Sequence, residues 1–191
     1  MIKVAITGII VSGKSEVARI VSDLGGFVLS ADKINREMLA DNDYLHKLKE
    51  HFPEAFTEGF NKAVLTATVF NNEEKRMLLN SIAHPEIDRR MRIQAEGKEL
   101  VFCEIPLLSA EWAEEFDRIW LVRCSEEGRV ARICARDGRN EEQARRMVDS
   151  QSAYRDIIYV NCDIIDNNGC LDDLNQQVGR LYCKLLKKQS V

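Results

Sequence analysis

Short apolar runs alternate along the chain with longer segments of helical periodicity. The runs predict five buried strands, at residues 2–7, 27–29, 100–105, 118–123 and 162–166. After the first run and a Gly- and Ser-containing turn, apolar residues recur at helical spacing up to a Gly-Gly stop signal, which predicts a helix before the second strand. Because apolar strands that alternate with helices form parallel sheets, the pattern predicts an α/β fold: a parallel five-stranded sheet with helices on both faces.

Residues 33–96 have a different character from the rest of the chain. Polar and charged residues dominate there, helical spacings recur and no convincing strand is present. We therefore expect one domain over residues 1–191 that carries a helical insertion at 33–96, interrupted near Pro53 and again at His84-Pro85. A last helix is predicted from the apolar positions Leu171, Leu174, Val178, Leu181 and Leu185, which share one face.

Composition and charge exclude several classes of protein. Apolar residues make up 45% of the 191 residues, which is enough for a core and argues against disorder. The net charge of -4 argues against a protein that coats nucleic acid, although one local basic site remains compatible with it. No apolar run approaches the ~20 residues that span a bilayer, and the first residues lack a signal-peptide pattern. We expect a cytoplasmic protein without nucleic-acid or membrane partners.

The six cysteines form no Cys-x-x-Cys pair, and none of the three histidines lies at the spacing from a cysteine that zinc ligands have. Reduced thiols, rather than disulfides or a zinc site, are the expectation for a chain of this kind.

One motif carries specific chemistry. Residues 8–15 read Gly-Ile-Ile-Val-Ser-Gly-Lys-Ser, which fits the G-x-x-x-x-G-K-[ST] pattern directly after a predicted strand and before a predicted helix. Successive backbone N–H groups of such a loop form an anion site, Lys14 reaches the β- and γ-phosphates, and the Ser15 hydroxyl ligates Mg²⁺. An ordinary glycine-containing turn is the alternative, which the context disfavours. The residues expected to contact the nucleotide, which the resemblance given below implies is ATP, are Gly8, Val11, Ser12, Gly13, Lys14, Ser15 and Glu16.

Ligands of parallel sheets bind at the carboxyl ends of the strands, and we expect the ends of the first three strands to lie near one another. Two acidic residues lie at these ends, Asp32 after the second strand and Glu104 near the end of the third. Asp32 is either a base that deprotonates an acceptor hydroxyl or the N-cap of a helix that starts at Lys33. Glu104 is a candidate for holding Mg²⁺ through water.

An arginine stripe lies between the fourth and fifth predicted strands. Its spacing of three, four and three residues places Arg129, Arg132, Arg136 and Arg139 on one helical face. The stripe is either a lid over phosphates, at residues 128–147, or a solvated face paired with neighbouring acids. We expect the second for most of these arginines and phosphate contact for one or two.

With these residues assembled, the chain resembles the dephospho-CoA kinases, which catalyse the last step of coenzyme A biosynthesis. The resemblance runs nearly end to end and keeps its order: Thr7 to Ser15, Ser30-Ala31-Asp32 with Arg36, His84-Pro85, Glu104 to Leu108, Arg136-Asp137 with Gln151, and Asp163 to Gly169. The phosphate-loop pattern is shared by many enzymes, whereas Pro-Leu-Leu, His-Pro and Asn-Asn-Gly in this order are far more specific.

The resemblance implies transfer of the γ-phosphoryl of ATP to the ribose 3′-hydroxyl of dephospho-CoA, with Mg²⁺. It implies Asp32 as general base, Lys14 and Arg136 as stabilisers of the transferring group, and Ser15 with Glu104 at the metal. It implies acceptor binding by the 33–96 insertion, with substrate contacts at Thr7, Asp32, Arg36, His84, Pro106 and Leu107. We expect a monomer or weak homo-oligomer.

Three departures from the family pattern stand out. Ile9 and Val11 replace two loop glycines, Ser30 replaces the first acid of Asp-Ala-Asp, and Ala110 stands where the family has Glu, with Glu111 next to it. If position 11 needs a positive φ, a β-branched residue there is strained by on the order of 1–3 kcal/mol. A degenerate phosphate-loop protein that binds nucleotide or CoA precursor without efficient transfer therefore stays open, as does a nucleoside or nucleotide kinase.

Overall fold

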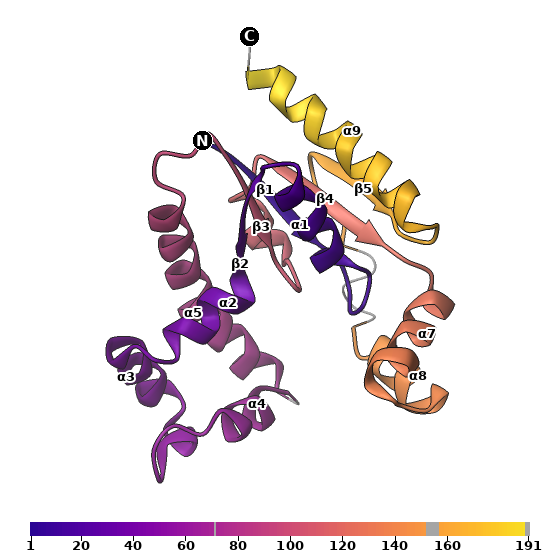
Figure 1. Cartoon of the computed structure of the whole chain (residues 1–191). Helices are drawn as coiled ribbons and strands as arrows, with labels where there is room; N and C mark the ends of the chain where they lie inside the picture. Colours follow the sequence, from indigo (N-terminus) through magenta and orange to yellow (C-terminus); the bar gives the residue numbers. More distant parts are fainter. Residues whose placement is uncertain (71, 152–156, 190–191) are drawn as a thin grey trace. The chain divides into compact units, whose positions relative to one another are not determined.

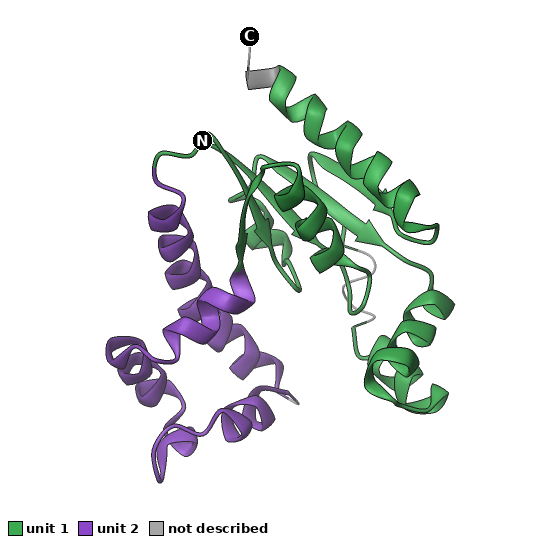
Figure 2. Cartoon of the chain, in the orientation of Figure 1, with its two compact units in different colours: residues 1–30, 97–191 green, residues 31–96 purple. Residues whose placement is uncertain are grey.

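The computed structural model describes residues 1–70, 72–151 and 157–189. It contains two compact units, Met1–Ser30 with Gly97–Val191 and Ala31–Glu96 (Figure 2). We refer to them as the sheet unit and the helical unit.

The sheet unit is built on five parallel strands (Figure 1). They are β1 (Ile2–Thr7), β2 (Phe27–Ser30), β3 (Leu100–Glu104), β4 (Arg118–Arg123) and β5 (Cys162–Asp166), in the order β2-β3-β1-β4-β5. The predicted sheet is confirmed, with boundaries that differ by one residue in β2 and β3. Although β3 ends before Ile105, the Ile105 N–H still donates to the Ile6 carbonyl at 2.9 Å.

The register brings the carboxyl ends of three strands together. Glu104 at the end of β3 lies opposite Ile6 of β1 on one side and Ser30 of β2 on the other. The first two strands are parallel, as expected, but β3 lies between them. The expected meeting of the ends of β1, β2 and β3 is therefore correct.

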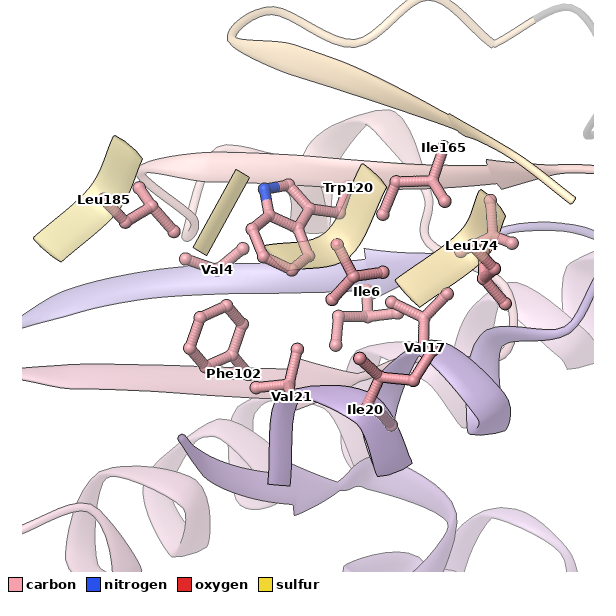
Figure 3. Packing of buried hydrophobic residues seen from close by; sticks show 13 residues of the cluster. Val4, Ile6, Val17, Ile20, Val21, Phe102, Trp120, Ile165, Leu174 and Leu185 are labelled. Carbon is pink, nitrogen blue, oxygen red and sulfur yellow. The ribbon is translucent and has the colours of Figure 1, made fainter. Parts of the chain in front are cut away.

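One apolar cluster joins the sheet to α1 (Lys14–Asp23) and α9 (Leu171–Gln189), as Figure 3 shows. Side chains on one face of the strands, such as Val4, Phe102 and Trp120, meet the apolar faces of these two helices. Four of the five predicted apolar positions of α9 are in this cluster or against it, whereas Leu171 at its first turn is 50% exposed. Side chains alternate along a strand, so Lys3 points to the other face, where its ammonium lies 5.0 Å from the ring centroid of Phe116, after α6 (Ala110–Ala113).

The segment expected as a lid forms two helices, and Arg139 lies between them rather than on the helical face of the other three arginines. α7 (Glu126–Asp137) ends at Gly138 in the left-handed conformation, and α8 (Glu141–Asp149) begins with an Asn140–Gln143 capping box. The two helices share a small apolar core made of Val130, Ile133, Ala144 and Val148. We call these four residues the hairpin core.

The helical unit consists of α2 (Ala31–Met38), α3 (Asn42–His51), the 3₁₀ helix η1 (Pro53–Phe56), α4 (Lys62–Phe70) and α5 (Glu73–Gln94). The predicted interruption near Pro53 is confirmed. The second interruption is wrong, because α5 continues through Pro85. Proline removes one helical hydrogen bond, and the burial of Ala83, Ile87 and Met91 around it holds the helix together.

Two further expectations can be compared with the described residues. All six cysteines lie within the described ranges and are thiols, as predicted. Within those ranges, no helix combines the length and the apolar character that crossing a bilayer requires.

Candidate active site

The phosphate loop connects β1 to α1 and depends on two glycines. Gly8 has a φ of 152°, and a Cβ there would lie 2.4 Å from the Val122 carbonyl oxygen. Gly13 has a φ of 103°, and a Cβ there would lie 2.0 Å from Nδ2 of Asn167. A side chain is therefore excluded at both positions by space as well as by backbone conformation.

Val11 adopts the conformation that makes its side chain costly. Its φ is +55°, in the left-handed region that β-branched residues rarely occupy. The condition set out from the sequence is therefore met, and the loop carries backbone strain on the order of 1–3 kcal/mol at this residue.

The ammonium group of Lys14 lies within the turn of the loop. Its Nζ donates hydrogen bonds to the carbonyl oxygens of Gly8 at 2.8 Å and Ile9 at 3.1 Å. The positive charge is thus held at the loop backbone, where phosphate oxygens bind in loops of this type.

Ser15 and Glu104 form the second polar element of the site. The Ser15 hydroxyl donates to Oε1 of Glu104 at 2.5 Å, which joins the first turn of α1 to the end of β3. Mg²⁺ prefers hard oxygen ligands and is commonly held by one or two protein oxygens together with substrate phosphates. Among the described residues, no group of three or more His, Cys, Asp or Glu is arranged to hold a metal by itself. The hydroxyl–carboxylate pair fits a magnesium ion that arrives with a nucleotide.

The outer side of the loop is held by side chains distant in sequence. Nη1 of Arg132 lies 3.5 Å from the Val11 carbonyl oxygen and 3.3 Å from that of Ser12, and its Nη2 donates to the Asn167 carbonyl at 2.7 Å. The buried Asn167 amide also donates to the Ser12 carbonyl at 2.7 Å. The Ile10 N–H donates to Oε1 of Gln151 at 2.6 Å. In the sequence, these three side chains belong only to a stripe or to a family motif, and a contact with the loop backbone was predicted for none of them.

The arginine stripe divides into different environments. Arg129 is only 3% exposed, so the expectation of a solvated face is wrong for it. Arg132 contacts the loop, as described above. Arg136 forms a two-pronged ion pair with Asp137, at 2.7 and 3.0 Å, and is not brought to the phosphate loop. This pair raises the pKa of Arg136 and lowers the pKa of Asp137. The expected pairing with neighbouring acids is thus correct for Arg136.

Glu16, an expected ATP contact, forms an ion pair with Arg19 on the same helix at 2.6 Å. The hydrogen bond from Arg19 lowers the pKa of the Glu16 carboxyl group. Three expected acceptor contacts also lie in the sheet unit: Thr7 is buried at the end of β1, and Pro106 and Leu107 are half-buried after β3.

Three other predicted site residues belong to the helical unit. Asp32 is exposed in the first turn of α2, which begins one residue earlier, so the alternative of an N-cap before Lys33 is wrong. The Nε of Arg36, one turn later, lies 3.4 Å from the Asp32 carbonyl oxygen. His84 is half-buried within α5.

Comparison with known proteins provides evidence that is independent of this geometry. The sequence model of the family described as dephospho-CoA kinase matches residues 2–173. A dephospho-CoA kinase of Carboxydothermus hydrogenoformans is 31% identical over 185 residues, which cover 92% of this chain and 90% of that protein. TT1252 from Thermus thermophilus, a crystal structure, is 30% identical with a TM-score of 0.74 over 96% of this chain and 97% of that one.

A further solved structure agrees in fold. The dephospho-CoA kinase from Campylobacter jejuni has a TM-score of 0.64 at 24% identity, with 98% of each chain covered. The match of the family model to most of the chain and the relatives at 30% identity or more lead to one assignment: this chain belongs to the dephospho-CoA kinase family.

Proposed function

We propose that this chain performs the reaction of its family by transferring the γ-phosphoryl group of ATP to the ribose 3′-hydroxyl of dephospho-CoA, which yields coenzyme A and ADP. The observation that carries the proposal is the pairing of Ser15 with Glu104 beside a phosphate loop whose Lys14 is held at the loop backbone. This arrangement supplies both the anion site and the metal ligands that phosphoryl transfer needs.

Each group in the sheet unit has a distinct task in this proposal. Backbone N–H groups of the loop and the Lys14 ammonium bind the β- and γ-phosphates and stabilise the charge that spreads over the transferring group. Ser15 directly and Glu104 through water would hold Mg²⁺, which would neutralise charge on the phosphate oxygens.

Asp32 is the proposed general base. It follows the end of β2 by two residues, and the last residue of β2 is paired in register with Glu104. An exposed carboxylate in the first turn of a helix is available to accept the proton of an acceptor hydroxyl. Arg36, His84 and the rest of the helical unit would bind the acceptor, together with Thr7, Pro106 and Leu107.

Arg136 is proposed to act on the transferring group from the lid segment 128–147. Its ion pair with Asp137 is exposed, at 60% for the arginine side chain, and exposed pairs contribute little net free energy. Exchange of Asp137 for a phosphate oxygen is therefore inexpensive, which supports this role.

The setting proposed is the cytoplasm, with small-molecule substrates, no nucleic-acid or membrane partner, and a monomer or weak homo-oligomer. The net charge of -4 supports the absence of polyanionic partners. The two alternatives, a binding protein without efficient transfer and a nucleoside kinase, are not favoured, because relatives across nearly the whole chain are dephospho-CoA kinases.

The test is ADP formation by the purified protein with Mg-ATP, in the presence and absence of dephospho-CoA, with detection of coenzyme A by mass. ADP that depends on the acceptor, with a matching coenzyme A product, is expected. Binding of dephospho-CoA without product would favour the binding protein, and turnover with a nucleoside instead would favour the other kinase class.

The base is tested by Asp32→Asn. We expect kcat to fall by about 100-fold or more, because the amide does not accept the proton, while the Kd for ATP stays within about twofold. Glu37→Gln, an exposed acid of the same helix, is the matched control. Near-normal turnover of the Asp32 variant would exclude Asp32 as the base.

A further inference from the structure

The phosphate loop carries backbone strain at Val11 that a glycine at this position would not have. Val11 is held at a φ of +55°, where its side chain disfavours the conformation. A loop in this state relaxes to another conformation unless surrounding groups hold it. The question is which groups hold it.

Two side chains contact the carbonyl oxygens of Val11 and of Ser12, the residue after it. Arg132 bridges the carbonyls of Val11, Ser12 and Asn167 with its planar fork, and the Asn167 amide donates a second hydrogen bond to Ser12. Asn167 is only 8% exposed, so these hydrogen bonds are shielded from competing water.

The direction of a carbonyl fixes the direction of the next N–H. In a planar trans peptide, the C=O and the following N–H point to opposite sides. Donors that hold the Ser12 carbonyl toward Arg132 and Asn167 therefore hold the Gly13 N–H toward the opposite side. N–H groups of this part of the loop bind nucleotide phosphates. The hydrogen bonds that Arg132 and Asn167 donate to the Ser12 carbonyl therefore orient an N–H group toward the phosphates.

The side chains at the tip of the loop are anchored to the same helix pair. Ile10 and Val11 pack against the hairpin core, and the Ile10 N–H donates to Gln151 just beyond α8. The Val11 side chain, which causes the backbone strain, thus also makes an apolar contact with the hairpin core. Relaxation of the loop would lose this contact together with the hydrogen bonds to Arg132 and Asn167.

We propose that Arg132 and Asn167 are positioning residues that hold the strained phosphate loop in its ATP-binding conformation from the outer side. Neither residue is required to touch ATP. Each acts through the backbone of Ser12 and, for Arg132, of Val11. This inference rests on the proposed function for its substrate, ATP, but not on phosphoryl transfer itself.

The expected kinetic signature is a change in ATP affinity rather than in the chemical step. If the binding-competent loop becomes a minor conformation, the apparent Kd rises by the inverse of its population. We expect Arg132→Lys, Arg132→Met and Asn167→Ser each to raise the KM for ATP and the Kd of a non-hydrolysable ATP analogue by about 10-fold, with kcat within about twofold. Arg132→Lys is decisive because lysine keeps the charge but lacks the fork that bridges three carbonyls.

A double-mutant cycle with Val11→Gly links the effect to strain. Glycine adopts the left-handed conformation without a steric cost, so the loop then depends less on its outer supports. We expect Arg132→Lys to weaken binding of the analogue by no more than about threefold in the Val11→Gly background. The control is Arg146→Met on α8, because Arg146 pairs with the exposed Glu142. We expect this variant to bind the analogue with wild-type affinity.

The outcomes separate this proposal from its alternatives. Wild-type affinity in Arg132→Lys would overturn it in favour of a simple charge effect, and an equal loss in both Val11 backgrounds would show that Arg132 does not act through loop strain. A fall in kcat at unchanged affinity would make Arg132 a catalytic group instead. Calorimetry measures the Kd of the analogue in the presence of Mg²⁺ even if no coenzyme A forms. A failure of the proposed function can therefore be distinguished from a failure of this inference. Circular dichroism identifies a variant that does not fold, and Asn167→Ser then carries the test.

Discussion

The phosphate loop and the helical unit are stabilised by different kinds of contact. The loop is held by side chains from 120 to 155 positions away in sequence, such as Arg132 and Asn167, which donate to backbone carbonyls. The helical unit carries ion pairs three or four residues apart on one helix, such as Arg89–Glu86 and Arg92–Asp88. The loop therefore depends on tertiary structure, whereas many polar contacts of the helical unit are local.

This difference determines what a substitution should change. Exposed ion pairs at helical spacing contribute about 0.2–0.5 kcal/mol each and are weakened by salt. Hydrogen bonds around the loop fix the direction of groups that meet the phosphates, so we expect their loss to weaken ATP binding. We expect variants of the loop to change kinetics at nearly constant stability, and variants of the helical unit to change stability in a pH-dependent way.

The largest effect is expected for Lys14→Met. Removal of the ammonium takes a positive charge from the β- and γ-phosphates, and kcat/KM should fall by about 1,000-fold or more, with the thermal midpoint within a few degrees of the wild type. Steady-state ADP formation and a thermal melt measure the two quantities. Lys187→Met, at an exposed position of α9, is the control. A large fall in the melting temperature of Lys14→Met would contradict the separation between kinetic and stability effects.

Glu104→Gln should have a smaller effect on the same site. The carboxylate accepts from the Ser15 hydroxyl, and groups that orient or hold a metal typically change its affinity by about 10–100-fold. We expect the Mg²⁺ concentration for half-maximal activity to rise by that factor, with partial recovery at high Mg²⁺. Glu99→Gln, at an exposed position just before the same strand, is the matched control. An unchanged Mg²⁺ dependence would remove Glu104 from the metal site.

The features that could be predicted from the sequence are local ones. The five strands were predictable because each is a short apolar run, and the phosphate loop because its motif lies between a strand and a helix. The condition under which Val11 is strained, a positive φ, could also be stated in advance, and the observed φ of +55° meets it. For Asp32, the alternative of an N-cap failed because α2 begins at Ala31, two residues before the expected start at Lys33.

The features that could not be predicted depend on tertiary contacts. The arginine stripe has one helical spacing, yet Arg132 faces the loop, Arg136 pairs with its neighbour Asp137, and Arg129 is buried. Periodicity places residues on one face but does not say what packs against each turn of it. Pro85 shows the same limit, since burial around it maintains a helix that the local signal would end.

The smallest effect is expected in the helical unit, at Glu86. This carboxylate accepts hydrogen bonds from Arg89 and Arg90, and Arg90 also pairs with Asp41, the N-cap of α3. The hydrogen bond from Arg89, followed by that from Arg90, lowers the pKa of Glu86 from 4.5 to about 2. A carboxyl group whose pKa is lower in the folded state stabilises the fold above its unfolded pKa and loses this contribution as pH falls toward the folded pKa.

Glu86→Gln should therefore destabilise α3 and α5 at pH 7 by about 1–2 kcal/mol, a value reduced from the full shift because solvent screens these charges. Between pH 4.5 and about 2 the wild type should lose this advantage, so the two proteins should converge in stability. Hydrogen exchange of the amides of α3 and α5 at several pH values measures the difference within the helical unit itself. Glu50→Gln, whose exposed partner His46 lies 3.8 Å away, should change these amides by no more than about 0.5 kcal/mol. A difference between wild type and Glu86→Gln that stays constant down to pH 3 would mean that packing, rather than the charge of Glu86, links these helices.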